Sequence, residues 1–358
     1  MKLPQDKTPT SLGFAMPPEW EKHAATWMAW PHYEPDWPGK LAAVEWVYGE
    51  MIRKIAAGEK VCLLVNSPLQ EKRAAGILRL ARAPMDQIKF HRIATDRAWM
   101  RDSGPIFIKK RRNNTALGAA VFCFNAWAKY PNWEHDTLAG TAVAQKVHAL
   151  IVRPMAGKKP FVLEGGSIDV NGRGSLLTTE ECLLDPATQA RNPGVSKDEV
   201  ELILKNHLGA GNILWLGRGI AGDDTHGHVD DVCRFVNART VVCCQEKNSK
   251  DENYRALAEN EERLQGMRLE DGSLIQSVPL PMPSPLYHGD LRLPASYANF
   301  YVTNTSVLVP TFNDAMDRLA LGILSELFAN RTVTGIHAVD LVRGFGTIHC
   351  LTQQQPEL

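Results

Sequence analysis

The chain is organised around the stretch Gly222-Asp223-Asp224-Thr225-His226-Gly227-His228-Val229-Asp230-Asp231. It places four carboxylates and two imidazoles within ten residues, and apolar residues such as Phe235 follow at once. A run so hydrophilic does not fit inside a core, so we expect it at a strand end beside a cavity. If residues 228–232 are extended, His228 and Asp230 point to one face, because side chains alternate along a strand. The alternative is a solvated turn with a capping Asp, which is typical of runs rich in Asp and Gly.

The overall composition is that of a globular protein with a small ligand. Hydrophobic residues make up 44% of the 358 residues, which is enough for a sizeable core. Lys plus Arg and Asp plus Glu balance at 40 each, without long charged blocks, which argues against nucleic acid or a membrane surface as a partner. The N-terminal stretch has no apolar signal segment, and no later apolar run approaches ~18 residues. We therefore expect a cytoplasmic protein. No sequence feature fixes the oligomeric state, and a homo-oligomer is compatible with the sequence.

The seven cysteines are scattered, and none forms a CxxC pair. Most lie in apolar runs, as expected of buried thiols in a reducing compartment, and Cys182 is predicted to be a core residue. Cys350 is different, because it follows Gly344-Phe345-Gly346-Thr347 and therefore lies on irregular backbone. A reactive thiol could be exposed there.

Apolar runs of strand length alternate with helical periodicity to the end of the chain, without a linker of domain scale. The sequence therefore predicts one α/β domain over residues 1–358. No sequence repeat is visible, although a structural repeat of strand and helix units could be hidden by divergence. The expected strands are 24–30, 61–65, 88–93, 106–109, 117–124, 161–163, 175–179, 213–216, 240–245, 300–309 and 333–336. The expected helices are 41–57, 68–82, 136–150, 197–208, 252–265 and 314–329.

Four polar loops at predicted strand ends could supply one site together, and they carry Asp102, Glu164, His228 with Asp230, and Cys350. Acids, a thiol and a His suit a guanidinium group, which is planar, permanently cationic and rich in donors. Two carboxylates can hold its edges by paired hydrogen bonds while a nucleophile approaches the central carbon from the face. A thiolate forms near neutral pH when a cation lies close, and the bound substrate is that cation. The imidazole can protonate departing ammonia and later take a proton from water.

Six motifs in the same order give the chain a resemblance to a known family. They are the Trp- and Pro-rich segment 16–38, Trp99-Met100-Arg101-Asp102-Ser103-Gly104-Pro105, Leu163-Glu164-Gly165-Gly166-Ser167, Leu177-Thr178-Thr179-Glu180-Glu181-Cys182-Leu183-Leu184, Asp224-Thr225-His226-Gly227-His228-Val229-Asp230 and Ile348-His349-Cys350-Leu351-Thr352-Gln353-Gln354. The chain resembles the agmatine deiminases, guanidine-modifying enzymes related to bacterial peptidylarginine deiminase. The resemblance implies the pentein fold, a fivefold pseudosymmetric α/β propeller.

The resemblance also implies a role for each residue of the constellation. Cys350 is similar to the nucleophile of the family, His228 to its general acid/base, Asp102 and Asp230 to the guanidinium clamps, and Glu164 to the acid that orients the network. The implied reaction converts agmatine to N-carbamoylputrescine and ammonia through a covalent amidino intermediate on the thiol. It belongs to polyamine biosynthesis, towards putrescine. Neither a metal nor an organic cofactor is implied.

Two further residues are implied in substrate binding, and two depart from the family pattern. Trp99 would wall the pocket, and Asp224 would bind the distal amine of the substrate. Family members commonly carry three glycines before the Ile-His-Cys sequence, whereas Phe345 and Thr347 stand here. A ring near the nucleophile could reshape the pocket, so the substrate could be another arginine derivative, such as a C-terminal peptidylarginine.

Two other functional classes remain as alternatives. The first is a zinc hydrolase with His226, His228 and Asp230 as ligands, which would leave Cys350 and Asp102 without a task. The second is a non-catalytic binding protein with the same fold. Outside these alternatives, His226 is interpreted as structural and His349 as a turn residue.

Overall fold

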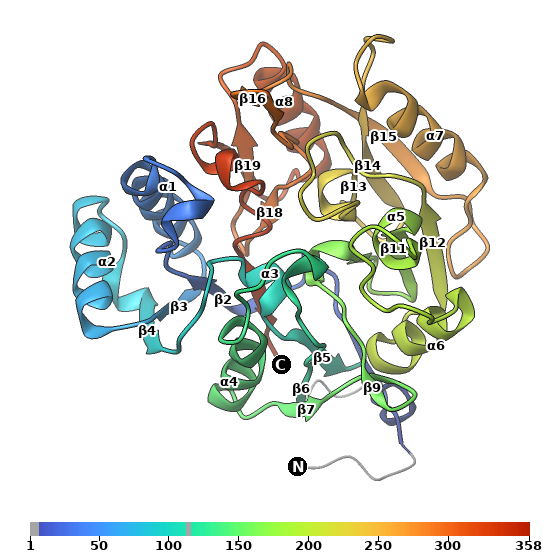
Figure 1. The fold of residues 1–358 in the computed structure, drawn as a ribbon, viewed down its shortest axis with the longest axis horizontal. Coiled ribbons are helices and arrows are strands. Elements are labelled where there is room, and N and C mark those ends of the chain that lie inside the picture. The colour runs from blue at the N-terminus through green and yellow to red at the C-terminus, as the bar shows by residue number, and fades with distance from the viewer. Residues whose placement is uncertain (1–6, 112–115) are drawn as a thin grey trace.

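Five small sheets stand in a ring around a common centre, with the longer helices towards the outside (Figure 1). In this computed structural model, residues 7–111 and 116–358 are described. Every sheet repeats one pattern: a leading strand runs antiparallel to its neighbour, and that neighbour runs parallel to the strand after it. The leading strands, as we call them below, are β5, β10, β13, β18 and β21.

The first sheet joins the two ends of the chain. Its order is β21 (Gln353–Pro356), β2 (His23–Ala29), β3 (Lys60–Val65) and β4 (Ile88–Arg92), with helices α1 (Leu41–Ile55) and α2 (Pro68–Leu80). Five of the six residues of β3 are buried, which explains its nearly continuous apolar sequence. Because β21 pairs with β2, the last strand closes the ring against the first large strand.

The second and third sheets follow in chain order. The second contains β1 (Phe14–Ala15), β5 (Ile106–Lys110), β6 (Leu117–Ala120) and β7 (Leu150–Val152), with α3 (Met100–Ser103) and α4 (Asp136–Lys146). The third contains β10 (Asp169–Val170), β11 (Ser175–Thr179) and β12 (Asn212–Leu216), with α5 (Glu180–Leu184) and α6 (Lys197–Leu208). Ser196 caps α6 by accepting a hydrogen bond from the Glu199 amide at 3.3 Å.

The fourth and fifth sheets complete the ring. The fourth contains β13 (Cys233–Phe235), β14 (Thr240–Gln245) and β15 (Gln276–Pro281), with α7 (Asn253–Gly266). The fifth contains β18 (Tyr301–Val302), β19 (Ser306–Thr311) and β20 (Thr332–His337), with α8 (Asp317–Leu327). Two short hairpins lie outside the repeat, β8 (Met155–Ala156) with β9 (Lys159–Pro160) and β16 (Tyr287–His288) with β17 (Leu291–Arg292).

The predicted pentein-type fivefold α/β propeller is confirmed, and so is a structural repeat hidden in the sequence. Several local predictions were wrong, among them the expected strand 117–124, which ends at Ala120. The expected strand 300–309 is a hairpin, because Thr303 Oγ1 accepts the amides of Thr305 and Ser306 and turns the chain. The expected helix 136–150 ends at Lys146, and the expected strand 161–163 is only an isolated bridge.

A short turn precedes every leading strand, and these turns bring distant segments together. They are α3 before β5, and the 3₁₀ turns Gly165–Ser167 before β10 and Val229–Asp231 before β13. Tight turns at 297–298 and 348–351 precede β18 and β21. Among the described residues, no helix combines the length and the apolar character needed to cross a bilayer.

Candidate active site

Cys350 lies in the turn before β21 and lines a cavity of about 300 Å³ together with Asp102. Asn299 Nδ2 donates a hydrogen bond to the Cys350 Sγ at 3.1 Å, and the sulfur lies 3.7 Å from Asp230 Oδ2. Five aromatic residues line the same cavity together with Pro, Gly and charged residues: Tyr33, Trp99, Trp127, Tyr130 and Phe345. The thiol therefore faces an open space with both aromatic and charged groups on its wall.

The glycines before the thiol are needed for close approach. A Cβ on Gly346 would lie 3.2 Å from the Cys350 Sγ and 2.8 Å from the Trp99 ring. The two residues that depart from the family pattern behave differently. Thr347 is buried and donates its hydroxyl to Asn299 Oδ1 at 2.8 Å, whereas Phe345 lines the cavity with a left-handed φ of 65°. Only Phe345 can therefore touch a ligand, and its backbone is strained for an aromatic residue.

His228 lies at the centre of three buried carboxylates. Its Nδ1 is 3.9 Å from Asp102 Oδ1 and 3.9 Å from Asp230 Oδ1, and its Nε2 is 3.8 Å from Glu164 Oε2. These separations are too long for hydrogen bonds, and within the described chain neither ring nitrogen has a partner. Burial lowers the pKa of His228, but Asp102, Cys182 and Glu164 outweigh it and hold the pKa well above the usual value. The ring is therefore a cation able to donate a proton.

Asp102 is held by two donors. Its Oδ2 accepts from Trp127 Nε1 at 2.9 Å, and its Oδ1 accepts from the Gly166 amide at 3.0 Å. Burial raises the pKa of Asp102 to about 6; the charge of His228 opposes this shift, and those of Asp230 and Glu164 add to it. A Cβ on Gly166 would lie 2.6 Å from His228 Nδ1 and 2.9 Å from Asp102 Oδ1, so only glycine fits between them.

Glu164 is anchored on the far side of His228 by an arginine that sequence reasoning did not identify. Arg191 Nε donates to Glu164 Oε1 at 3.1 Å, and both side chains are fully buried. Burial raises the pKa of Glu164, but Arg191 and His228 outweigh it and lower the pKa to about 2. Glu164 is therefore ionised, and its Oε2 faces the imidazole without another protein partner in the described chain.

The thiol itself is protonated in the unliganded protein. Burial raises the pKa of Cys350 well above its usual value, and Asp230, Asp231 and Asp102 raise it further. A cation placed among these carboxylates would reverse the electrostatic part of this penalty. The site thus favours a thiolate when a cationic ligand is bound.

The two predicted substrate-binding residues lie on the same cavity. Trp99 packs against Trp37 with ring centroids 5.3 Å apart, and its Nε1 donates to Asp36 Oδ2 at 2.9 Å. Asp224 accepts from Tyr130 Oη at 2.7 Å and pairs with Lys129 at 2.5 Å. Its carboxylate is already bonded, so a ligand amine would share it with Lys129.

The extended conformation considered for residues 228–232 is not found. Residues Val229–Asp231 form a 3₁₀ turn, and the Val232 amide donates to the Val229 carbonyl at 3.0 Å. His228 and Asp230 still meet, because the turn folds both side chains towards the centre of the ring. Their proximity therefore comes from a tight turn and not from strand alternation.

The ligand set of the zinc alternative is not assembled. His226 Nε2 bonds to Asp185 Oδ2 at 2.9 Å, on the exposed side of the turn. Among the described residues, two buried groups place potential ligand atoms within 4.8 Å of one another, and neither contains His226. These are Glu164, Cys182 and His228, and Asp230, Asp231 and Cys350. Arg191, Asn299 and His349 already occupy carboxylate oxygens in these groups, so we assign no metal to them.

The structure therefore brings Cys350, His228, Asp102, Asp230 and Glu164 together, and we call these five residues the reactive cluster. Sequence reasoning missed Asn299, Trp127 and Arg191, which hold this cluster. Asn299 had a weak signal, a polar residue directly before a strong apolar strand, but Trp127 and Arg191 had none. The sequence analysis also interpreted His349 as a turn residue only, whereas its ring bridges the carboxylates of Asp230 and Glu19.

The arrangement can bind a planar cation and attack it. Asp102 on the cavity wall and Asp230 beside the Cys350 sulfur can accept the donors of a guanidinium group, and the thiol lies close enough to reach its carbon. The charged imidazole can protonate a leaving amine. This chemistry requires no group beyond the side chains described.

Comparison with known proteins gives consistent matches over nearly the whole chain. The model of the family of Porphyromonas-type peptidyl-arginine deiminases matches residues 15–356. An agmatine deiminase of Stutzerimonas stutzeri is 34% identical over 374 aligned positions, which cover 98% of this chain and 97% of the relative.

Two solved structures are similarly close. The agmatine deiminase of Enterococcus faecalis, solved catalysing its reaction, superposes with a TM-score of 0.90 at 31% identity and covers 100% of both chains. A Cys-to-Ser variant of the C. jejuni agmatine deiminase with substrate bound gives a TM-score of 0.83 at 30% identity, covering 96% of each chain.

Proposed function

The chain belongs to the family of Porphyromonas-type peptidyl-arginine deiminases, and we propose that it hydrolyses agmatine to N-carbamoylputrescine and ammonia. The observation that carries this proposal is the placement of the Cys350 Sγ 3.7 Å from Asp230, on the same cavity as Asp102. A thiol surrounded by carboxylates is poorly ionised alone and becomes a nucleophile when a cation binds.

In the first half of the proposed reaction, Asp102 and Asp230 bind the edges of the guanidinium group. The bound cation favours ionisation of Cys350, whose proton passes to solvent because His228 is already protonated, and the thiolate attacks the guanidinium carbon from the face. The tetrahedral adduct collapses when the C–N bond breaks, and His228 donates a proton so that the leaving group departs as ammonia. An amidino group remains bound to the sulfur.

In the second half, His228 has lost its proton and can act as a base. It takes a proton from water, whose oxygen attacks the amidino carbon, and the C–S bond then breaks. The product keeps the new oxygen as a ureido group, and the thiol is regenerated. Glu164 orients the imidazole in both halves from the side opposite Asp102 and Asp230.

The charges along the cavity favour agmatine over free arginine. Of the charged residues that line it in the described chain, Asp36, Asp102 and Asp224 are acidic and Arg97 is basic. Agmatine carries a second cation at its far end, whereas arginine adds a carboxylate there. Asp36 is paired with Arg97 and Asp224 with Lys129, so the excess charge along the wall is that of Asp102, and a ligand carboxylate would add to this negative charge where an amine would not. We place that amine near Asp224 and Asp36, with Trp99 against the chain between them.

The direct test is ammonia release from purified protein with agmatine, free arginine and a peptide ending in arginine. We expect kcat/KM for agmatine to exceed both others by at least about tenfold, which corresponds to about 1.4 kcal/mol. The Cys350→Ala variant controls for contaminating activity. Turnover of the peptide alone would move the proposal to peptidylarginine, and no ammonia from any of the three would reject it.

We also propose a cytoplasmic location. All seven cysteines are free thiols, and six of them are buried, as is usual for proteins of a reducing compartment. Fractionation of the producing cell would test this, since activity in a secreted or periplasmic fraction would contradict it.

A further inference from the structure

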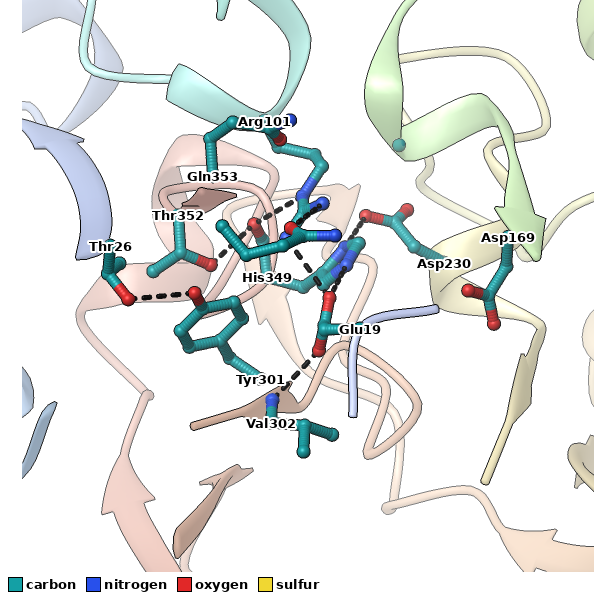
Figure 2. A network of polar contacts seen from close by, with 12 residues as sticks. Glu19, Thr26, Arg101, Asp169, Asp230, Tyr301, Val302, His349, Thr352 and Gln353 are labelled. Carbon is teal, nitrogen blue, oxygen red and sulfur yellow. Dashed lines mark hydrogen bonds and ion pairs between the residues drawn. The ribbon is translucent and has the colours of Figure 1, made fainter. Parts of the chain in front are cut away.

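A buried network of charges lies next to the reactive cluster and outside the cavity wall (Figure 2). Its centre is Glu19, which precedes β2. Glu19 Oε2 accepts from His349 Nε2 at 2.8 Å and from Arg101 Nη2 at 3.1 Å. Its Oε1 accepts from the Val302 amide at 2.8 Å and lies 3.2 Å from Arg234 Nη2. We call Glu19, Arg101, Arg234 and His349 the central network.

His349 connects this network to the reactive cluster. Its Nδ1 lies 2.6 Å from Asp230 Oδ2, so each ring nitrogen faces a carboxylate oxygen (Figure 2). An ionised carboxylate only accepts hydrogen bonds, so two such contacts require both ring nitrogens to donate, as an imidazolium does. Burial raises the pKa of both Glu19 and Asp230. Arg234 and His349 outweigh this effect for Glu19, and His349 outweighs it for Asp230, so both pKa values lie below the usual range.

The hydrogen bond with His349 determines which oxygen of Asp230 is left for a ligand. Oδ2 is occupied by the imidazolium, while Oδ1 has no partner in the described chain and lies 3.9 Å from His228 Nδ1. Six ionisable groups interact electrostatically with the Asp230 carboxylate: His349, His228, Arg234, Asp231, Asp102 and Cys350. Of these, His349 makes the shortest contact and is itself held by Glu19.

We propose that Glu19 and His349 are positioning residues for the reaction, with Glu19 holding His349 and His349 fixing the orientation and the charge of Asp230. The inference rests on the proposed function, because Asp230 acts there as a clamp. Asp230 Oδ2 lies 3.7 Å from the Cys350 Sγ at the cavity, and His349 and Glu19 lie behind Asp230 in that order, so we expect both to act on a substrate through Asp230. The N-terminal segment thereby takes part in a site whose nucleophile is next to His349 in the sequence but 331 residues from Glu19.

A matched pair of variants separates the two bonds of the ring. In His349→Asn, the amide nitrogen can replace Nδ1 and still donate to Asp230, whereas in His349→Gln it can replace Nε2 and donate only to Glu19. We expect His349→Gln to raise KM for agmatine by ~10–100-fold and His349→Asn by much less.

A double-mutant cycle shows whether His349 acts through Asp230. In an Asp230→Asn background, His349→Gln should change KM little further, because the carboxylate that it serves is gone. Additive effects of the two substitutions, or equal effects of His349→Asn and His349→Gln, would overturn the proposal.

One measurement needs no turnover and separates this inference from the proposed function. Nitrogen-15 NMR of histidine-labelled protein should show both ring nitrogens of His349 protonated at neutral pH, with the signal assigned by its loss in His349→Asn. Glu19→Gln should remove one of the two protons. A neutral ring in the wild type overturns the inference even if agmatine is hydrolysed. An imidazolium in a protein without activity would confirm the charge state of the central network but reject the function, and with it the positioning role.

Discussion

The reactive cluster and the central network are adjacent and equally buried, but they differ in how completely their polar atoms are paired. In the described chain, both ring nitrogens of His228, Glu164 Oε2 and Asp230 Oδ1 have no hydrogen-bond partner. No such atom occurs among the described side chains of Glu19, Arg101, Arg234 and His349. A buried polar group without a partner costs about 1–3 kcal/mol. The cluster is therefore held open for a ligand, and the network supplies a rigid, paired base beside it.

The largest expected effect tests the reactive side of this comparison. Cys350→Ala should reduce ammonia release by ~10⁴-fold or more, because no other group can form the covalent bond. Its free energy of unfolding should change by less than about 1 kcal/mol, because the lost sulfur faces a cavity. Steady-state kinetics and chemical denaturation of the same preparation measure both. A variant that keeps a tenth of the activity would remove the thiol from the mechanism.

The second largest effect is expected on the unfolding free energy, and it tests the central network. Arg234→Ala would leave Asp169 buried without its arginine and Glu19 with Arg101 as its remaining arginine, and we expect a loss of about 3–5 kcal/mol in unfolding free energy. Arg239→Ala is the matched control, since Arg239 pairs with Asp271 on the surface and its loss should cost less than about 1 kcal/mol. Equal losses for the two variants would show that the network does not carry the stability that its pairing implies.

The pH dependence of kcat/KM tests the protonation of one carboxyl group of the reactive cluster, Asp102. Burial raises the pKa of Asp102 to about 6, so this group gains a proton as the pH falls through 6 and loses the charge that binds a cation. We expect kcat/KM to fall by about tenfold per pH unit below that value. The Asp102→Asn variant should be slower throughout and should lack this limb. A limb near pH 6 that survives in the variant would assign it to another group.

The residues of the reactive cluster could be identified from the sequence, whereas almost none of the contacts of the central network could be. Asp102, Glu164 and Cys350 each stand beside Gly or polar residues near a predicted strand end, and the guanidinium chemistry followed from their side chains. The contact between Glu19 and His349 spans 330 residues and depends on the closing of the ring by β21 and β2. Local spacing contains no information about that closure. The fivefold repeat was hidden for a similar reason, since its units share an architecture and not side chains.

The turn at Val229–Asp231 shows where local reasoning fails even inside a correctly chosen stretch. Alternation was a sound rule for a strand, but Asp223 Oδ2 accepts the amides of Gly227 and His228 and folds the stretch into turns instead. His349 is similar: its backbone lies in a turn as expected, while its ring is engaged by two carboxylates from other segments. Residue types could be identified from the sequence, and their partners could not.

The smallest expected effect tests whether the backbone next to the reactive cluster is strained. Ala126, Trp127 and Ala128 have φ values of 50°, 58° and 53°, so three consecutive residues other than glycine are left-handed. This turn places Trp127 Nε1 on Asp102 Oδ2 at 2.9 Å. Ala128 is exposed, so Ala128→Gly should relieve strain without removing packing and raise the unfolding free energy by about 0.5–1 kcal/mol.

Ala258→Gly is the control for the Ala128 test, because Ala258 is exposed within α7 and right-handed. There the same change should lower the unfolding free energy by up to about 1 kcal/mol. Opposite signs at the two positions would place stored strain at the wall of the cavity, in the element that fixes Asp102. A loss at Ala128 as large as that at Ala258 would mean that the left-handed turn costs nothing. The unpaired atoms would then be the whole difference between the two regions.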